Sequence, residues 1–286
     1  MKLSCFADFA PGETLTQRAN YLVQAGFDAM ELVGKPDEIK ALMPEARQIL
    51  DGGRLRVSAI CALHRGWLVD PDAEARRAAK EDIRALLDLA GELDGCGVFV
   101  IPILGYTHAY PGGPRTGRTP DGDREVLIEG LSELAAYAHQ ARATLFLEVI
   151  NRYESPVANT LAEGAEIARR VAQPAFRLNA DFFHMNIEEA DPAAALWQCG
   201  TALGHIHAGD STRTYPGFGN LDYPKLVRAL VEGGYDQYLT VDARDLRLDP
   251  HRVLTAVCRY LRGLISLVEE RACLAPTATV SLSSGS

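Results

Sequence analysis

The chain has 286 residues, 47% of them hydrophobic and 23% charged, which is the balance of a soluble globular protein. Its net charge is −9 and no block of Lys and Arg stands out, so we do not expect a nucleic-acid partner, which would need a basic stripe. No apolar run approaches the roughly 20 residues that span a bilayer. The N-terminal MKLSCFADFA also lacks the apolar core of a signal peptide, and we therefore predict a cytoplasmic protein with no membrane partner.

Short β-rich runs alternate with helical runs from the first residues to about residue 270. Helical periodicity is clearest in the segments 14–25, 71–93 and 250–269. Gly26 can end the first of these helices. In the second, Asp70 is the expected cap and Pro71 the first helical residue. The predicted strands are 2–7, 28–33, 55–61, 96–102, 144–149, 176–181, 203–208 and 238–242.

This alternation predicts parallel strands joined by helical crossovers, and we expect a single-domain (β/α)8 TIM barrel over 1–272. A doubly wound open sheet is the competing fold, but it needs a glycine-rich phosphate turn after the first strand, where Phe6-Ala7-Asp8 stands instead. The segment 103–123 is a long Gly/Pro-rich loop after the fourth strand, typical of a lid or binding loop. The end of the chain, 273–286, has low complexity and is predicted to be a disordered tail.

The cysteines predict buried reduced thiols, because they are scattered and form no CxxC pair of the kind that a zinc ribbon uses. They are Cys5, Cys61, Cys96, Cys199, Cys258 and Cys273.

Four polar residues stand at the ends of the last four predicted strands. They are Glu148, Asp181, His207 and Asp242, separated by about one βα unit each. Because the chemistry of a TIM barrel lies at the carboxyl ends of its strands, we expect the four side chains to meet. Three carboxylates together would repel one another unless a cation lies between them. An oxygen-rich site with one imidazole suits Mn²⁺, Mg²⁺ or Co²⁺ better than a thiolate-seeking ion, and of these we expect Mn²⁺.

A second polar set follows these positions. Glu154, His184 and Arg213 have the donors and acceptors to bind the hydroxyls and carbonyl of a polyol. Two structural alternatives remain open at this point, since His184 could cap the next helix and Arg213 could pair with Asp210.

Several stretches resemble the xylose isomerase-like barrel epimerases, especially the D-tagatose 3-epimerase and D-psicose 3-epimerase group. The matching stretches are LEVINRYE (147–154), DFFHMNIEE (181–189), HIHAGDSTRTYPGFGNLDY (205–223) and GYDQYLTVD (234–242).

The resemblance implies a metal-dependent sugar isomerase or epimerase that works through an enediolate. It implies that Glu148, Asp181, His207 and Asp242 bind the metal ion, and that Glu148 and Asp242 are the two catalytic acid–bases. It further implies a small carbohydrate substrate and a homodimer or homotetramer. The substrate-binding residues would be Glu154, His184, Arg213, Trp67, Phe6 and Cys61.

The chain departs from the family at Asp242, where the family has glutamate. Aspartate is one methylene shorter, and catalytic geometry tolerates a displacement of only about 0.5 Å. We therefore expect weak 3-epimerisation of simple ketoses. The alternatives are a dehydratase of a keto-cyclitol or dehydroshikimate-like acid and a non-catalytic sugar-binding protein. An apurinic endonuclease is disfavoured, because that class uses about three zinc ions and many histidines, whereas this chain has seven histidines.

Overall fold

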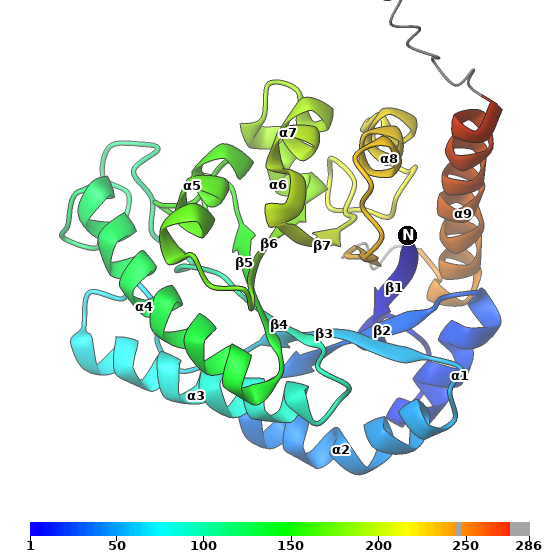
Figure 1. Ribbon diagram of the computed structural model, residues 1–286, viewed down its shortest axis with the longest axis horizontal. Helices are drawn as coiled ribbons and strands as arrows, with labels where there is room; N and C mark the ends of the chain where they lie inside the picture. The colour runs from blue at the N-terminus through cyan, green and yellow to red at the C-terminus, as the bar shows by residue number, and fades with distance from the viewer. Residues whose placement is uncertain (244–247, 275–286) are drawn as a thin grey trace, which may run out of the picture.

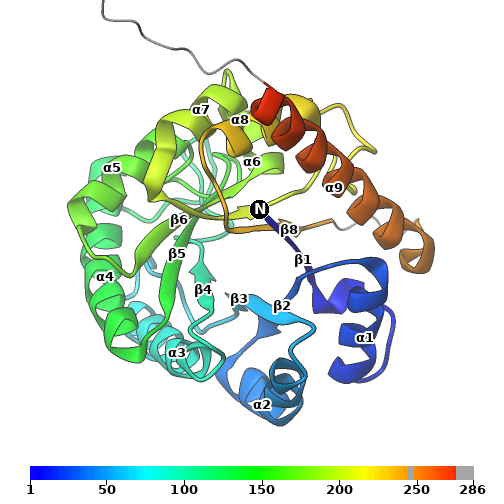
Figure 2. The same ribbon diagram turned by 45° about the vertical axis from the view of Figure 1, so that its right-hand side comes forward.

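The computed structural model describes residues 1–243 and 248–274, which form a closed barrel of parallel strands in the order β1-β2-β3-β4-β5-β6-β7-β8 (Figure 1). The predicted (β/α)8 TIM barrel is confirmed. The helices form a ring around the strands (Figure 2). No helix in these two ranges combines the length and apolar character that a membrane span requires.

The strands of the barrel are β1 (Lys2–Phe6), β2 (Ala29–Gly34), β3 (Arg56–Ala62), β4 (Gly97–Val100), β5 (Thr144–Val149), β6 (Phe176–Asp181), β7 (Leu203–His207) and β8 (Tyr238–Val241). The helices are α1 (Leu15–Ala25), α2 (Pro36–Asp51), α3 (Ala73–Gly91), α4 (Pro120–Ala141), α5 (Leu161–Val171), α6 (Phe182–Glu188), α7 (Pro192–Cys199), α8 (Tyr223–Glu232) and α9 (Pro250–Leu274), with short 3-10 turns at Ala7–Phe9 and Gly200–Ala202.

The ends of α1 are those that the sequence predicts. Thr14 accepts a hydrogen bond from the backbone N–H of Gln17, and the side-chain oxygen of Gln17 accepts one from the backbone N–H of Thr14, which together form a capping box. Gly26 ends the helix with a φ of 99°, a left-handed conformation that costs glycine little.

Several predicted boundaries are wrong by a few residues. Helix α3 begins at Ala73 instead of 71, because Asp72 is the N-cap and accepts from the backbone N–H of Glu74. The long loop ends before Pro120 instead of at 123, since Thr119 caps α4 there. Helix α9 continues past 269 to Leu274 and so enters the predicted tail, of which 275–286 lie outside the described residues.

Two apolar clusters fill the molecule. The larger lies between the strands and the surrounding helices, and the smaller one consists of Phe6, Ala59, Phe99 and Phe146. Glycine makes room for one of these rings, since a Cβ at Gly97 would lie 1.9 Å from the Phe146 ring. Inside the barrel the aromatic cluster contacts the polar side chains described below, because Phe99 packs edge-on against His207 and Phe146 stacks on His205.

Four of the cysteines, Cys5, Cys96, Cys199 and Cys258, are buried thiols, and Cys61 is partly exposed.

Candidate active site

Three of the four predicted metal ligands form a tight buried cluster at the carboxyl ends of their strands. Asp181 and His207 are Cα partners across β6 and β7, and Glu148 lies on the adjacent β5. One ligand atom of each of Glu148, Asp181 and His207 lies within 4.8 Å of the others. Asp181 is oriented by its second role as N-cap of α6, since its Oδ1 accepts from the backbone N–H of Phe183 at 2.7 Å while Oδ2 faces Arg213 and His184.

The fourth predicted ligand, Asp242, follows the end of β8 and is also buried. Among residues 1–243 and 248–274, the group whose ligand atoms lie within 4.8 Å of one another contains Glu148, Asp181 and His207 but not Asp242. Its Oδ2 lies 3.6 Å from Nη2 of Arg213, and the same nitrogen lies 3.5 Å from Oδ2 of Asp181. The guanidinium of Arg213 therefore lies between two of the carboxylates.

Glu148 and Asp242 have opposite pKa shifts. Burial and the charge of Asp181 raise the pKa of Asp242 to about 6. Burial also opposes ionisation of Glu148, but the charges of His207, His184 and Arg213 outweigh it and lower the pKa of that carboxyl. Two carboxylic acids whose pKa values are driven apart are suited to the roles of base and acid.

The loop after β7 positions Arg213. The buried Asp210 accepts hydrogen bonds from the backbone N–H groups of Ser211, Gly217 and Leu221, at 2.7, 2.9 and 3.2 Å. Arg213 has a φ of 57°, a left-handed conformation that costs a non-glycine residue about 1–3 kcal/mol. Of the two alternatives, pairing with Asp210 is wrong, because the carboxylate of Asp210 binds the loop backbone and the guanidinium faces the buried acids.

His184 lies inside α6 and does not cap it, so that alternative is also wrong. Its Nδ1 accepts from the backbone N–H of Asn151 at 3.2 Å, and its Nε2 lies 3.6 Å from Oδ2 of Asp181 and 3.4 Å from Nη2 of Arg213. The Nδ2 of Asn151 donates to Oε1 of Glu154 at 2.9 Å. Asn151, which is buried, thus connects two predicted substrate-binding residues and is a site residue that the sequence reasoning did not assign.

A cavity of about 450 Å³ opens over these groups. Glu154, His184 and Arg213 line it on the polar side, and the predicted Phe6, Cys61 and Trp67 belong to its apolar side. The ring of Trp67 packs edge-on against His64 at 5.3 Å.

The long loop after β4 also reaches this cavity, because Ile101 and Leu104 are part of its lining. The backbone N–H of Gly105 donates to the carbonyl of Glu154 at 2.9 Å, which joins the loop to the segment that carries a predicted substrate-binding residue.

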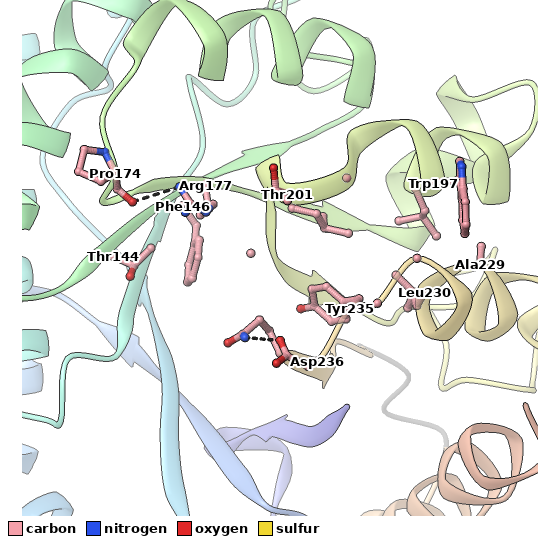
Figure 3. A pocket seen from close by; sticks show the side chains of 17 residues that line it. Thr144, Phe146, Pro174, Arg177, Trp197, Thr201, Ala229, Leu230, Tyr235 and Asp236 are labelled. Carbon is pink, nitrogen blue, oxygen red and sulfur yellow. Dashed lines mark hydrogen bonds between the residues drawn. The ribbon is translucent and has the colours of Figure 1, made fainter. Parts of the chain in front are cut away.

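A second hollow, of about 480 Å³, lies at the amino ends of β5, β6 and β7 (Figure 3). Arg177 is part of its lining and donates to the carbonyl of Pro174 at 3.1 Å. Because the catalytic groups of TIM barrels lie at the carboxyl ends of the strands, its larger volume does not make it the active site.

Glu31 and His205 are buried polar residues that the sequence reasoning did not assign. Nε2 of His205 lies 2.8 Å from Oε2 of Glu31, and Nε2 of His207 lies 3.1 Å from Oε1. Burial opposes ionisation of Glu31, but the two histidines lower its pKa to about 2. The sequence does contain one indication of this pair, because Glu31 is a charged residue inside the otherwise apolar run AMELVG.

Comparison with known proteins agrees with the barrel fold. The family model described as xylose isomerase-like TIM barrel matches residues 19–264. The 3-dehydro-D-guloside 4-epimerase of Escherichia coli K12 is 31% identical over 87% of this chain and 95% of its own length. The D-psicose 3-epimerase of Agrobacterium fabrum is 29% identical over 75% of this chain and 74% of its own.

Among solved structures, the apo form of a 3-keto-D-glucoside 4-epimerase from E. coli superposes with a TM-score of 0.84 at 29% identity, over 92% of this chain and 99% of the other. The predicted resemblance to sugar epimerases is confirmed, and the chain belongs to the xylose isomerase-like TIM-barrel family.

Proposed function

We propose that this protein is a metal-dependent epimerase or isomerase that moves a proton at a carbon next to the carbonyl of a keto-sugar, through an enediolate. The observation that carries the proposal is the convergence of Glu148, Asp181 and His207 beside a cavity of about 450 Å³. A cytoplasmic location and a homodimeric or homotetrameric state remain predictions.

The donor set fits a divalent cation. Two carboxylates and one imidazole within 4.8 Å of one another are hard to bury without a positive charge. Such oxygen-rich sets favour Mn²⁺, with Mg²⁺ or Co²⁺ as alternatives. Glu148, Asp181 and His207 would hold the ion, and Asp242 would complete the set after a small movement. When bound, the cation would polarise the carbonyl and stabilise the negative charge of the enediolate.

The protein's own carboxyl groups move the proton. Glu148, whose pKa is lowered, is ionised at neutral pH and acts as the base that removes the proton. We assign to Asp242 the role of the acid that returns one; in the metal-free site, burial and the charge of Asp181 raise its pKa to about 6. Return to the opposite face of the same carbon gives epimerisation, and return to the neighbouring carbon gives isomerisation.

Arg213, His184 and Glu154 hold the hydroxyls of the sugar. The Nε–H of Arg213 is buried and has no hydrogen-bond partner among residues 1–243 and 248–274, so a sugar oxygen would satisfy it. The imidazole of His184 lines the same wall, and Glu154 is an acceptor. The guanidinium also packs over the ring of Phe183 at 4.6 Å, which limits its orientation.

We propose a keto-glycoside as the substrate class in preference to a free ketose. The relative named 3-dehydro-D-guloside 4-epimerase aligns over 95% of its length, which supports this choice. The cavity also continues to Leu63 and Leu104, each 43% exposed, an apolar surface beyond the reacting groups that a second ring or aglycone would cover. A larger substrate pressed towards Asp242 would compensate for its shorter side chain.

The proposal is tested by proton exchange in D₂O. Mn²⁺-loaded protein is incubated with a panel of free ketoses and 3-keto-glycosides and followed by NMR. We expect deuterium to enter next to the carbonyl only when Mn²⁺ is present, and faster with the keto-glycosides. In parallel, Mn²⁺ at a hundredfold excess over Kd should stabilise the fold by about 2.7 kcal/mol. His207→Ala is expected to abolish that gain. No exchange with any substrate and no change in melting with Mn²⁺, Co²⁺ or Mg²⁺ would exclude the function.

Arg213→Ala is expected to lower kcat/KM by about 10- to 100-fold, because it removes charge-assisted hydrogen bonds of about 1.5–3 kcal/mol. The affinity for Mn²⁺ should not fall, because the guanidinium is a cation beside the acids. Arg152→Ala is the matched control, since Arg152 pairs with Glu188 outside the cavity and its loss should leave both quantities unchanged. Equal loss of Mn²⁺ affinity in Arg213→Ala would show that the arginine supports the metal site instead.

A further inference from the structure

A second polar layer lies in the barrel beneath the proposed metal ligands. Glu31 on β2, His205 on β7 and Thr240 on β8 are each 0% exposed. Strands β2 and β7 are separated by β8 and β1 in the barrel order, so Glu31 reaches the two histidines across the interior. Fully buried charged residues of this kind are rare unless they are paired.

The contacts of Glu31 fix the protons of both imidazoles. His207 Nε2–H donates to Oε1 of Glu31 at 3.1 Å, and His205 Nε2–H donates to Oε2 at 2.8 Å. An ionised carboxylate only accepts hydrogen bonds, so each histidine carries its proton on Nε2. With a cation bound, His207 would be neutral and its lone pair would be on Nδ1, which lies 3.4 Å from Oε1 of Glu148 and therefore on the side of the proposed metal position.

The neighbours of this layer leave little freedom of orientation. The ring of His205 stacks on Phe146 with a centroid distance of 5.3 Å, and Phe99 packs edge-on against His207 at 4.6 Å. The hydroxyl of Thr240 lies 3.0 Å from Nε2 of His205. The amide nitrogen of Asn179 lies 3.1 and 3.3 Å from the two ring nitrogens of His207.

We propose that Glu31 is a positioning residue for metal binding, held in place by His205, which orients His207 and fixes the tautomer that presents Nδ1 to the divalent cation. This inference rests on the proposed function. Outer carboxylates that accept from a metal-binding histidine raise the basicity of the ligand, and their loss typically costs about 10- to 100-fold in metal affinity.

The test is Glu31→Gln, titrated with Mn²⁺ by calorimetry after removal of bound metal. Glutamine keeps the size and one acceptor but removes the charge. We expect one Mn²⁺ per chain in both proteins and a Kd about 10- to 100-fold higher in the variant. A folded Glu31→Gln with the Kd of the wild type overturns the proposal. Wild type that binds a second ion, lost in the variant, also overturns it, because Glu31, His205 and His207 would then be a cation site.

Ser58→Ala is the matched control. Ser58 is a buried side chain on β3 that bonds to the hydroxyl of Ser4 at 2.7 Å and the carbonyl of Met30 at 3.1 Å. Its loss should lower Tm and leave the Mn²⁺ Kd unchanged. If Glu31→Gln does not fold, His205→Asn removes one donor to Glu31, and we expect a smaller rise of Kd. An unchanged Kd in that folded variant overturns the proposal. Wild type that binds no metal at all would refute the proposed function itself.

Discussion

Glu148→Gln is expected to lower the rate of substrate proton exchange by about 10²–10⁴-fold, the usual contribution of a general base. Glutamine has nearly the same shape and keeps an oxygen towards the cluster, but it cannot accept a proton. The loss should appear in kcat, measured in D₂O at an Mn²⁺ concentration that saturates the variant, with bound metal determined in the same sample.

The control for this variant is Glu188→Gln, which changes another buried glutamate that instead pairs with Arg152. Its exchange rate should stay close to that of the wild type. If metal-loaded Glu148→Gln still exchanges the substrate hydrogen at the wild-type rate, the base is a different residue and the assignment of Glu148 is wrong.

The barrel and the positions of its four strand-end residues could be predicted, because both depend on spacing. One βα unit separates each residue from the next, and the carboxyl ends of parallel strands meet at one end of a barrel. The predicted bounds of two strands, 144–149 and 176–181, agree with the structure, and these two strands bring Glu148 and Asp181 into the site.

The polar layer beneath the site could not be predicted in the same way. Glu31 and His205 lie within their strands, and sequence alone does not show which side chains of a fully buried strand face the barrel interior. The cap of α3 had a related ambiguity, since Asp70 and Asp72 have the same chemistry and only the backbone geometry selects Asp72. The orientation of Arg213 depends on the bonds of Asp210 to the loop, which a pattern of residue types does not contain.

Asp242→Asn is expected to stabilise the metal-free protein at neutral pH. The pKa of Asp242 is raised from 3.8 to about 6 by burial and by Asp181, so the folded state binds this proton more tightly than the unfolded state. That contribution to stability is present below pH 3.8 and is lost as the pH rises through about 6. A shift of about two pKa units corresponds to about 3 kcal/mol. Above pH 6 the neutral asparagine avoids the cost of burying an ionised carboxylate, so the variant should have the higher free energy of unfolding. This difference should disappear near pH 4.

The measurement is urea unfolding of both proteins in chelator between pH 4 and 8, and then again with Mn²⁺. With the ion bound the order should reverse, because the wild type gains the free energy of metal binding and asparagine is the poorer ligand. Asp242→Glu is the matched control: it keeps the charge, should show no such gain, and with its longer arm should speed epimerisation of free ketoses. If metal-free Asp242→Asn is less stable than the wild type at pH 7.5, the carboxylate is a structural partner of Arg213. The idea that the wild type gives up stability to keep a carboxylate ready for a cation would then be wrong. Such a loss of stability is expected only where function requires the destabilised group.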